Sequence, residues 1–207
     1  MKTAKKALGL MLVAVLLVTA TIFGTMAYLT DKDEVTNTFT VGSVDISLDE
    51  APVGADGKAT TGNRVQKNDY KLMPGHEYDK DPIVHFQTKS EASWLFIEVT
   101  NEIAGIESTA EGYKSIATQI TENGWKALVD ENNDGIADNG VYYQKVGANK
   151  SGSAVDYKVF QGFTVDGSVN GTTLDNYNNK TVKVTAYAVQ ADGFDSATAA
   201  WTTGLGK

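Results

Sequence analysis

The chain has 207 residues, of which 42% are hydrophobic and 21% are charged, and its formal net charge is −8. This composition predicts a folded domain rather than a disordered tail, because enough apolar residues are present to form one core. The negative charge argues against nucleic-acid binding, which depends on neutralising phosphates with Lys and Arg. Cysteine is absent, so core packing, a metal or partners must stabilise the fold in place of disulfides.

The first 27 residues are typical of an export signal. The charges before residue 31 are all basic: Lys2, Lys5 and Lys6. A largely apolar run follows, and Thr25 and Ala27 place small residues at the third and first positions before Tyr28, which predicts cleavage between Ala27 and Tyr28. An uncleaved membrane anchor is the alternative, since about 20 apolar residues can span a bilayer. In both cases most of the chain is expected outside the cytoplasm, with membrane contact only through an uncleaved signal.

The mature N-terminus would begin with the polar leader "YLTDKDEV". After it, Phe39 and Val41 alternate with Thr38 and Thr40, as a half-buried strand requires. Gly42 and Ser43 then interrupt the pattern, and a bend or bulge there could let the strand leave its own sheet. Residues 28–41 are therefore a candidate donor strand that pairs with another subunit, although most strand glycines mark only local geometry.

Period-two patterns dominate the rest of the chain. In "SWLFIEVT" the residues Leu95, Ile97 and Val99 fall on one face of a strand. In "TVKVTAYAVQ" Val182 and Val184 likewise share one face, so both stretches are predicted to be strands. The other strands that we expect lie at residues 44–48, 83–87, 125–129, 141–146 and 155–165. Helical patterns are short, at residues 111–120 and 195–203, and no βαβ rhythm is present. The sequence therefore predicts an all-β protein, an antiparallel β-sandwich of jelly-roll type with short helical segments, over residues 28–207.

Two polar regions connect these strands. Pro74-Gly75 in "LMPGHEY" predicts a type II turn, because proline fixes φ and glycine accepts a positive φ. Residues 149–170 and the "LDNYNNK" stretch at 174–180 are expected to be polar connections within one domain.

The loop "DENNDGIADNG" has the spacing of a calcium site. Its candidate ligands, at positions one, three, five, seven and nine, are Asp130, Asn132, Asp134, Ile136 and Asp138, the fourth through its carbonyl. Gly135 permits the tight turn, but position twelve is Val141, so the bidentate Glu of an EF-hand is missing. Calcium affinity would be weak, in the ~10⁻⁴–10⁻³ M class. The alternative is a solvated hairpin connection, since Asn, Asp and Gly are ordinary turn residues.

Four stretches carry a resemblance to a known family. They are the signal ending in "MAYLTD", then "TNTFTVGSVDISL", "LMPGHEYDKDPIVHFQTKSEASWLFIEV" and "TAYAVQADGFDSATAAW". Together they resemble the TasA/camelysin (CalY) family of Gram-positive exported proteins, whose signals are processed by a SipW-type signal peptidase. The resemblance implies a jelly-roll structural protein of the cell surface or the biofilm matrix. It also implies fibre assembly with itself or sibling proteins, by passing an N-terminal strand into the next subunit. Residues 101–171 depart from TasA.

Catalytic residues are scarce. Cys, HExxH and G-x-S-x-G motifs are all absent from the sequence, so neither a thiol nor a serine hydrolase is supported. Because relatives of camelysin have been classed as metallopeptidases, the resemblance implies His76, Glu77 and His85 as zinc candidates. "HEYDK" begins like HExxH, but Lys80 cannot replace the second His. We therefore expect that this protein is not an enzyme; the alternative is a secreted zinc peptidase.

Overall fold

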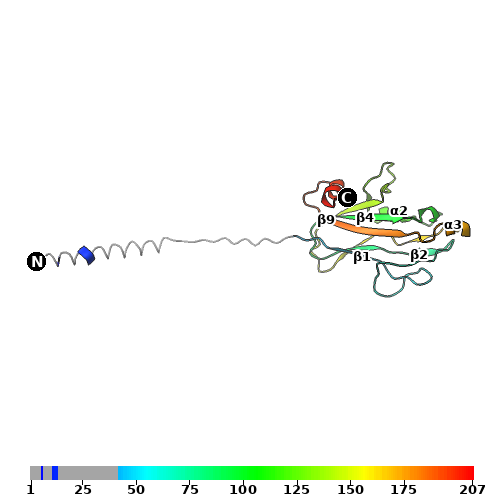
Figure 1. The fold of residues 1–207 in the computed structure, drawn as a ribbon, viewed down its shortest axis with the longest axis horizontal. Helices are drawn as coiled ribbons and strands as arrows, with labels where there is room; N and C mark the ends of the chain where they lie inside the picture. The colour runs from blue at the N-terminus through cyan, green and yellow to red at the C-terminus, as the bar shows by residue number, and fades with distance from the viewer. Residues whose placement is uncertain (1–5, 7–10, 14–41) are drawn as a thin grey trace. The chain divides into compact units, whose positions relative to one another are not determined.

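The structure is a computed structural model that describes Lys6, residues 11–13 and residues 42–207 (Figure 1). Apart from Lys6 and residues 11–13, the predicted signal lies outside the described residues, as do its cleavage site and the candidate donor strand. Gly42–Lys207 forms one compact unit. None of the helices in the described ranges is long and apolar enough to cross a membrane.

The strands of residues 42–207 form three antiparallel sheets. One sheet has the order β1 (Ile46–Asp49), β3 (Ile83–Phe86) and β7 (Val155–Lys158). The second has the order β5 (Lys126–Ala127), β6 (Val141–Val146), β4 (Ser93–Asn101) and β9 (Val182–Gln190). The third pairs β2 (Glu77–Asp79) with β8 (Gly162–Thr164). The all-β prediction is confirmed, whereas jelly-roll connectivity stays a prediction.

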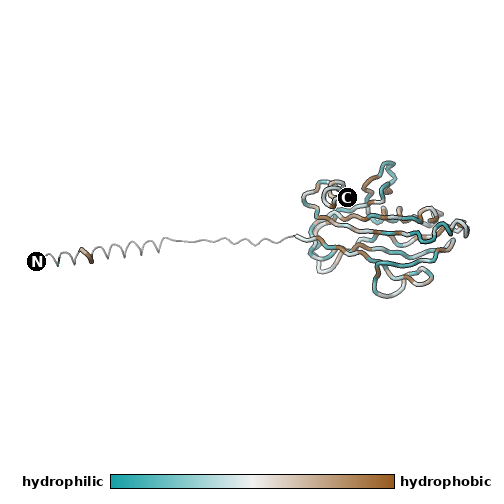
Figure 2. The backbone as a smooth tube through the Cα atoms, in the orientation of Figure 1, coloured by the Kyte–Doolittle hydropathy of each residue, from teal (hydrophilic) through white to brown (hydrophobic). Residues whose placement is uncertain are grey.

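The four-stranded sheet is apolar on both faces. Side chains with odd numbers on β4 and even numbers on β9, among them Leu95, Ile97 and Val184, pack into the main core. The opposite parity, with Trp94 and Phe96, packs into a second apolar cluster. This is the alternation that the sequence predicts for both strands, and Figure 2 shows how hydropathy changes along them.

The second cluster is covered by the C-terminal helical segment, α4 (Ala197–Ala199) followed by the π-turn η2 (Ala200–Gly204). The ring of Trp201 lies 5.2 Å from Phe96 and 5.4 Å from Tyr187, centroid to centroid. Burial of this aromatic side chain explains why so short a helix is stable, since isolated short helices are marginal in water. The helix expected at residues 195–203 is confirmed.

Several boundaries differ from the sequence predictions. The run expected at 155–165 divides into β7 and β8, because these strands belong to different sheets. The helix expected at 111–120 is α2 (Ile116–Glu122), which begins late because Ser115 caps its first turn. α3 (Gly171–Asp175) occupies the start of the predicted polar turn at 174–180, and η1 (Ala104–Ile106) is a single 3₁₀ turn.

The turn at Pro74-Gly75 is confirmed, with φ of 72° at Gly75 and a 3.2 Å hydrogen bond from His76 N to Met73 O. β2, which follows it directly, was not expected. Its only large apolar residue is Tyr78, so "EYD" has no visible alternation, and pairing with β8 across more than 80 residues of sequence determines it.

Candidate functional site

An open groove of about 1320 Å³ lies between β1 and β9. Both strands are at the edge of their sheets, since β1 pairs with β3 and β9 pairs with β4. Ile46 and Leu48 on β1, and Val182 and Val184 on β9, are half-buried and contact the main core. The groove therefore combines apolar side chains with two strand edges, which is the surface to which an added strand pairs.

Residues 65–72 form part of the groove wall. Val65 pairs with Glu50 through two backbone hydrogen bonds of 2.7 and 2.8 Å, and the chain beyond it forms no further bridge with β1. The wall is basic in part, because Lys71 and Lys183 line the groove and make no ion pair within the described residues.

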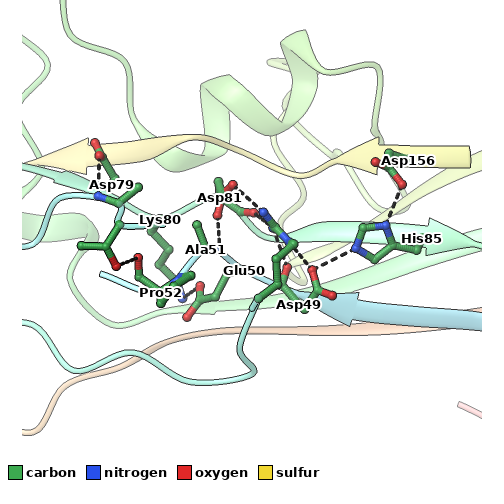
Figure 3. Close-up of polar contacts among 12 residues, drawn as sticks. Asp49, Glu50, Ala51, Pro52, Asp79, Lys80, Asp81, His85 and Asp156 are labelled. Carbon is green, nitrogen blue, oxygen red and sulfur yellow. Dashed lines mark hydrogen bonds and ion pairs between the residues drawn. The ribbon is translucent and has the colours of Figure 1, made fainter. Parts of the chain in front are cut away.

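A buried carboxylate lies at this wall. Glu50 is 5% exposed, and its two oxygens bind different partners. Lys80 Nζ lies 2.5 Å from Glu50 Oε2, and Asn68 Nδ2 donates to Glu50 Oε1 at 2.9 Å. Figure 3 shows Lys80 and Glu50 pointing toward one another from neighbouring segments. Burial of a charge is favourable only when it is paired and hydrogen-bonded, so these contacts fix Lys80 and Asn68 together.

Next to this carboxylate, a charged network covers the outer face of the three-stranded sheet (Figure 3). The guanidinium of Arg64 binds Asp49, and its Nη1 donates to Asp81 Oδ2 at 3.0 Å. His85 on β3 lies between two acids: its Nε2 is 2.9 Å from Asp49 Oδ1, and its Nδ1 is 2.6 Å from Asp156 Oδ1. Hydrogen bonds therefore join all three strands on this face.

The contacts of His85 determine its charge state. A neutral imidazole has one donor, so two carboxylate acceptors favour the doubly protonated form. Burial lowers its pKa, but the hydrogen bonds to Asp49 and Asp156 outweigh burial, and the pKa is raised overall. In this form neither ring nitrogen offers a lone pair to a metal.

The other zinc candidates lie at the start of β2. His76 Nε2 donates to the Asp56 carbonyl at 2.7 Å, and Glu77 lies 3.4 Å from Lys58 Nζ. No group of three or more His, Asp or Glu side chains in the described ranges is arranged to hold a metal ion.

The predicted calcium loop is closed by its own side chains. Asp130 accepts hydrogen bonds from the backbone N–H of Asp134 and Gly135, at 3.1 and 2.9 Å. Asp134 Oδ1 accepts from Ile136 N at 2.7 Å, and Asp138 Oδ2 from Glu131 N at 2.7 Å. These are the contacts of an Asx-rich turn, so calcium binding stays a prediction.

The other predicted site residues, Ala27, Tyr28, Thr38, Phe39, Thr40 and Val41, lie outside the described residues. Conversely, neither the groove nor the Glu50 contacts were predicted. The three residues Glu50, Asn68 and Lys80 lie 12 to 30 positions apart, and no local spacing marks them. The alternation of Val182 and Val184 predicted the strand β9 but did not indicate that its edge is open.

The fold and groove define an all-β protein in which the edges of β1 and β9 line an open groove. Comparison with known families then gives one match: residues 3–73 match a family model described as camelysin metallo-endopeptidase. This confirms the resemblance to the TasA/camelysin family over the N-terminal third of the chain. It supports an extracellular or cell-surface location. The matched region includes β1 and residues 65–72 of the groove wall. No curated protein and no solved structure gives a significant match.

Proposed function

We propose that this chain is an exported structural protein of the cell surface or extracellular matrix. In this proposal a SipW-type signal peptidase releases the mature chain, and residues 28–41 of one subunit pair with the groove between β1 and β9 of the next. The observation that carries the proposal is the groove itself, in which half-buried apolar side chains lie between two strand edges.

The donor sequence fits the groove in two respects. In an extended strand Phe39 and Val41 would lie on one face, where their apolar side chains would suit those of Leu48 and Val184. The leader before them carries acids at 31, 33 and 34, opposite in sign to the lysines of the groove wall.

The geometry of donation leads to filaments. A donated strand and an acceptor groove are different surfaces of the same subunit, so the contact is heterologous. Each subunit that donates its strand leaves its own groove open for another, and the chain of contacts does not close as in a two-fold dimer.

The test compares proteins that differ only in the donor segment. Protein beginning at Tyr28 should form filaments, seen by electron microscopy and light scattering, whereas protein beginning at Gly42 should stay folded and monomeric. The double substitution Phe39→Asp and Val41→Asp should abolish filaments. Its matched control, Thr38→Asp and Thr40→Asp, adds the same charges to the opposite face and should retain assembly. Filaments from the shortened protein would contradict strand donation.

A secreted zinc peptidase is the alternative, suggested by the description of the matched family. Purified mature protein should be assayed for zinc content and casein hydrolysis. Stoichiometric zinc, with hydrolysis abolished by His76→Ala, would overturn the structural role. The doubly hydrogen-bonded state of His85 supports the structural role.

A further inference from the structure

The three side chains that meet at Glu50 are an amine, an amide and a carboxylate. The Lys80 side chain is 11% exposed and that of Glu50 is 7% exposed. Glu50 holds the amine on one oxygen and the amide on the other, at 2.5 and 2.9 Å. Because the two oxygens belong to one carboxylate, Lys80 Nζ and the side-chain amide of Asn68 are neighbours, with Lys80 and Glu50 largely buried and Asn68 half-buried at the groove.

We propose that Lys80 and Asn68 form a covalent amide cross-link within the chain, with Glu50 carrying the protons. This inference does not depend on strand donation. It assigns a modification site to three residues whose buried ion pair contributes little net stability, since its replacement by apolar residues is often neutral or stabilising.

The reaction balances without an oxidant or cofactor. Lys80 Nζ transfers a proton to Glu50 Oε2, and the neutral amine attacks Cγ of Asn68. A bond forms between Nζ and Cγ, and the bond between Cγ and Nδ2 breaks. As the new bond forms, Nζ loses a second proton. Nδ2 takes up one proton by way of Glu50, which already accepts its hydrogen bond, and leaves as ammonia, which takes up the other proton to become ammonium. Overall, one ammonium side chain and one amide give a substituted amide and an ammonium ion, and Glu50 returns to a carboxylate.

The surroundings favour each step. Asn68 Oδ1 accepts a hydrogen bond from Val53 N at 3.1 Å, so a backbone N–H is already in place for the negative charge that develops on this oxygen. Tyr70 lies beside the cluster, and burial, followed by the charges of Glu50 and Asp81, raises the pKa of its hydroxyl, which keeps it neutral. Holding amine and amide on one carboxylate supplies the proximity that such reactions lack in solution.

The cross-link would join residue 68 to residue 80 beside the groove. It would tie the wall formed by residues 65–72 to the segment that leads into β3, independently of pH and salt. The ion pair alone would give way under acid or tension, whereas an amide would not.

Peptide mapping of the mature protein is the decisive test. Trypsin cleaves after Lys67, Lys71 and Lys89 but not after an acylated Lys80, so the cross-link predicts residues 68–71 joined to residues 72–89. The joined peptide should weigh one ammonia less than the sum of its parts. Intact mass alone is insufficient, because Asn-Gly sequences at Asn123, Asn139 and Asn170 can also lose ammonia. Separate peptides 68–71 and 72–80 from the folded wild-type protein would overturn the proposal.

Variants separate the roles of the three residues. Glu50→Gln keeps the shape of the side chain but cannot carry a proton, so it should leave the two peptides separate. Lys80→Met and Asn68→Ala each remove one reacting group and should do the same. Circular dichroism establishes whether each variant is folded, and a joined peptide in folded Glu50→Gln protein would contradict the role of Glu50. The wild-type map remains decisive if a variant fails to fold.

Discussion

The outer faces of the two larger sheets are stabilised by different means. On the three-stranded sheet, charged side chains from β1, β3 and β7 bind one another across the strands. On the four-stranded sheet, aromatic side chains are buried under the C-terminal helical segment. Apolar burial is insensitive to pH, whereas ion pairs depend on protonation and salt. A change of pH or salt can therefore weaken the charged face of this molecule while the aromatic face stays intact.

The largest effect is expected on the aromatic face. Trp201→Ala removes the ring that contacts Phe96 and Tyr187, and large-to-small changes of buried aromatics cost about 3–5 kcal/mol. We expect a loss near the lower end, because Trp201 lies at the edge of the cluster and is 9% exposed. Urea unfolding followed by Trp fluorescence measures it. Thr202→Ala, at an exposed neighbour, is the control and should change the free energy of unfolding little. If the two substitutions destabilise the protein equally, burial of the Trp201 ring is not what stabilises this face.

A smaller effect is expected on the charged face. Arg64→Met leaves Asp49 and Asp81 without their shared partner, and because all three side chains are about 30% exposed, water compensates in part. We expect a loss of about 1–2 kcal/mol, below the range for fully buried pairs. The control is Lys67→Met, whose ion pair with Asp69 is 79% and 88% exposed and should contribute almost nothing. A loss as large as that of Trp201→Ala would contradict the ranking of the two faces.

The stability of the charged face should depend on pH, whereas that of the aromatic face should not. The pKa of His85 is raised above its ordinary 6.5, so its contribution to stability is complete below that pH and is lost as pH rises through the folded value. Burial opposes the charge of Asp49, but the hydrogen bonds from His85 and Arg64 lower its pKa, so its contribution is present above 3.8 and lost in acid. Denaturation midpoints should fall from mildly acidic to alkaline pH, and His85→Gln should remove this slope. An unchanged slope would place its origin elsewhere.

The smallest effect concerns the loop at Asp130–Asp138, on neither outer face. If calcium binds with the weak affinity proposed from its spacing, stabilisation is about 0.4 kcal/mol when the calcium concentration equals the dissociation constant. Titration calorimetry at millimolar calcium measures binding directly. The double variant Asp130→Asn and Asp134→Asn keeps the turn's shape but removes two charges. Equal heat from that variant would end the calcium interpretation.

Sequence predicted the parts of the fold that depend on local pattern. β4 and β9 were recognised because their apolar residues alternate over nine positions, and the turn at Pro74-Gly75 because both residues restrict the backbone in a known way. β2 was missed because three residues around Tyr78 carry no pattern. The Glu50 contacts were missed for a related reason: Asn68 and Lys80 meet Glu50 only when the long connection between β1 and β3 folds back, and no spacing records that.

The covered face of the four-stranded sheet also limits the directions in which the proposed assembly can grow. With Trp94, Phe96 and Trp201 already buried under the chain's own C-terminal segment, that sheet offers no bare apolar face on which a second molecule could stack. The strand edges at the groove remain available. In the proposed assembly, subunits that add at such edges extend a line, and stacking through the apolar face of the four-stranded sheet would first require each subunit to lift its C-terminal segment away.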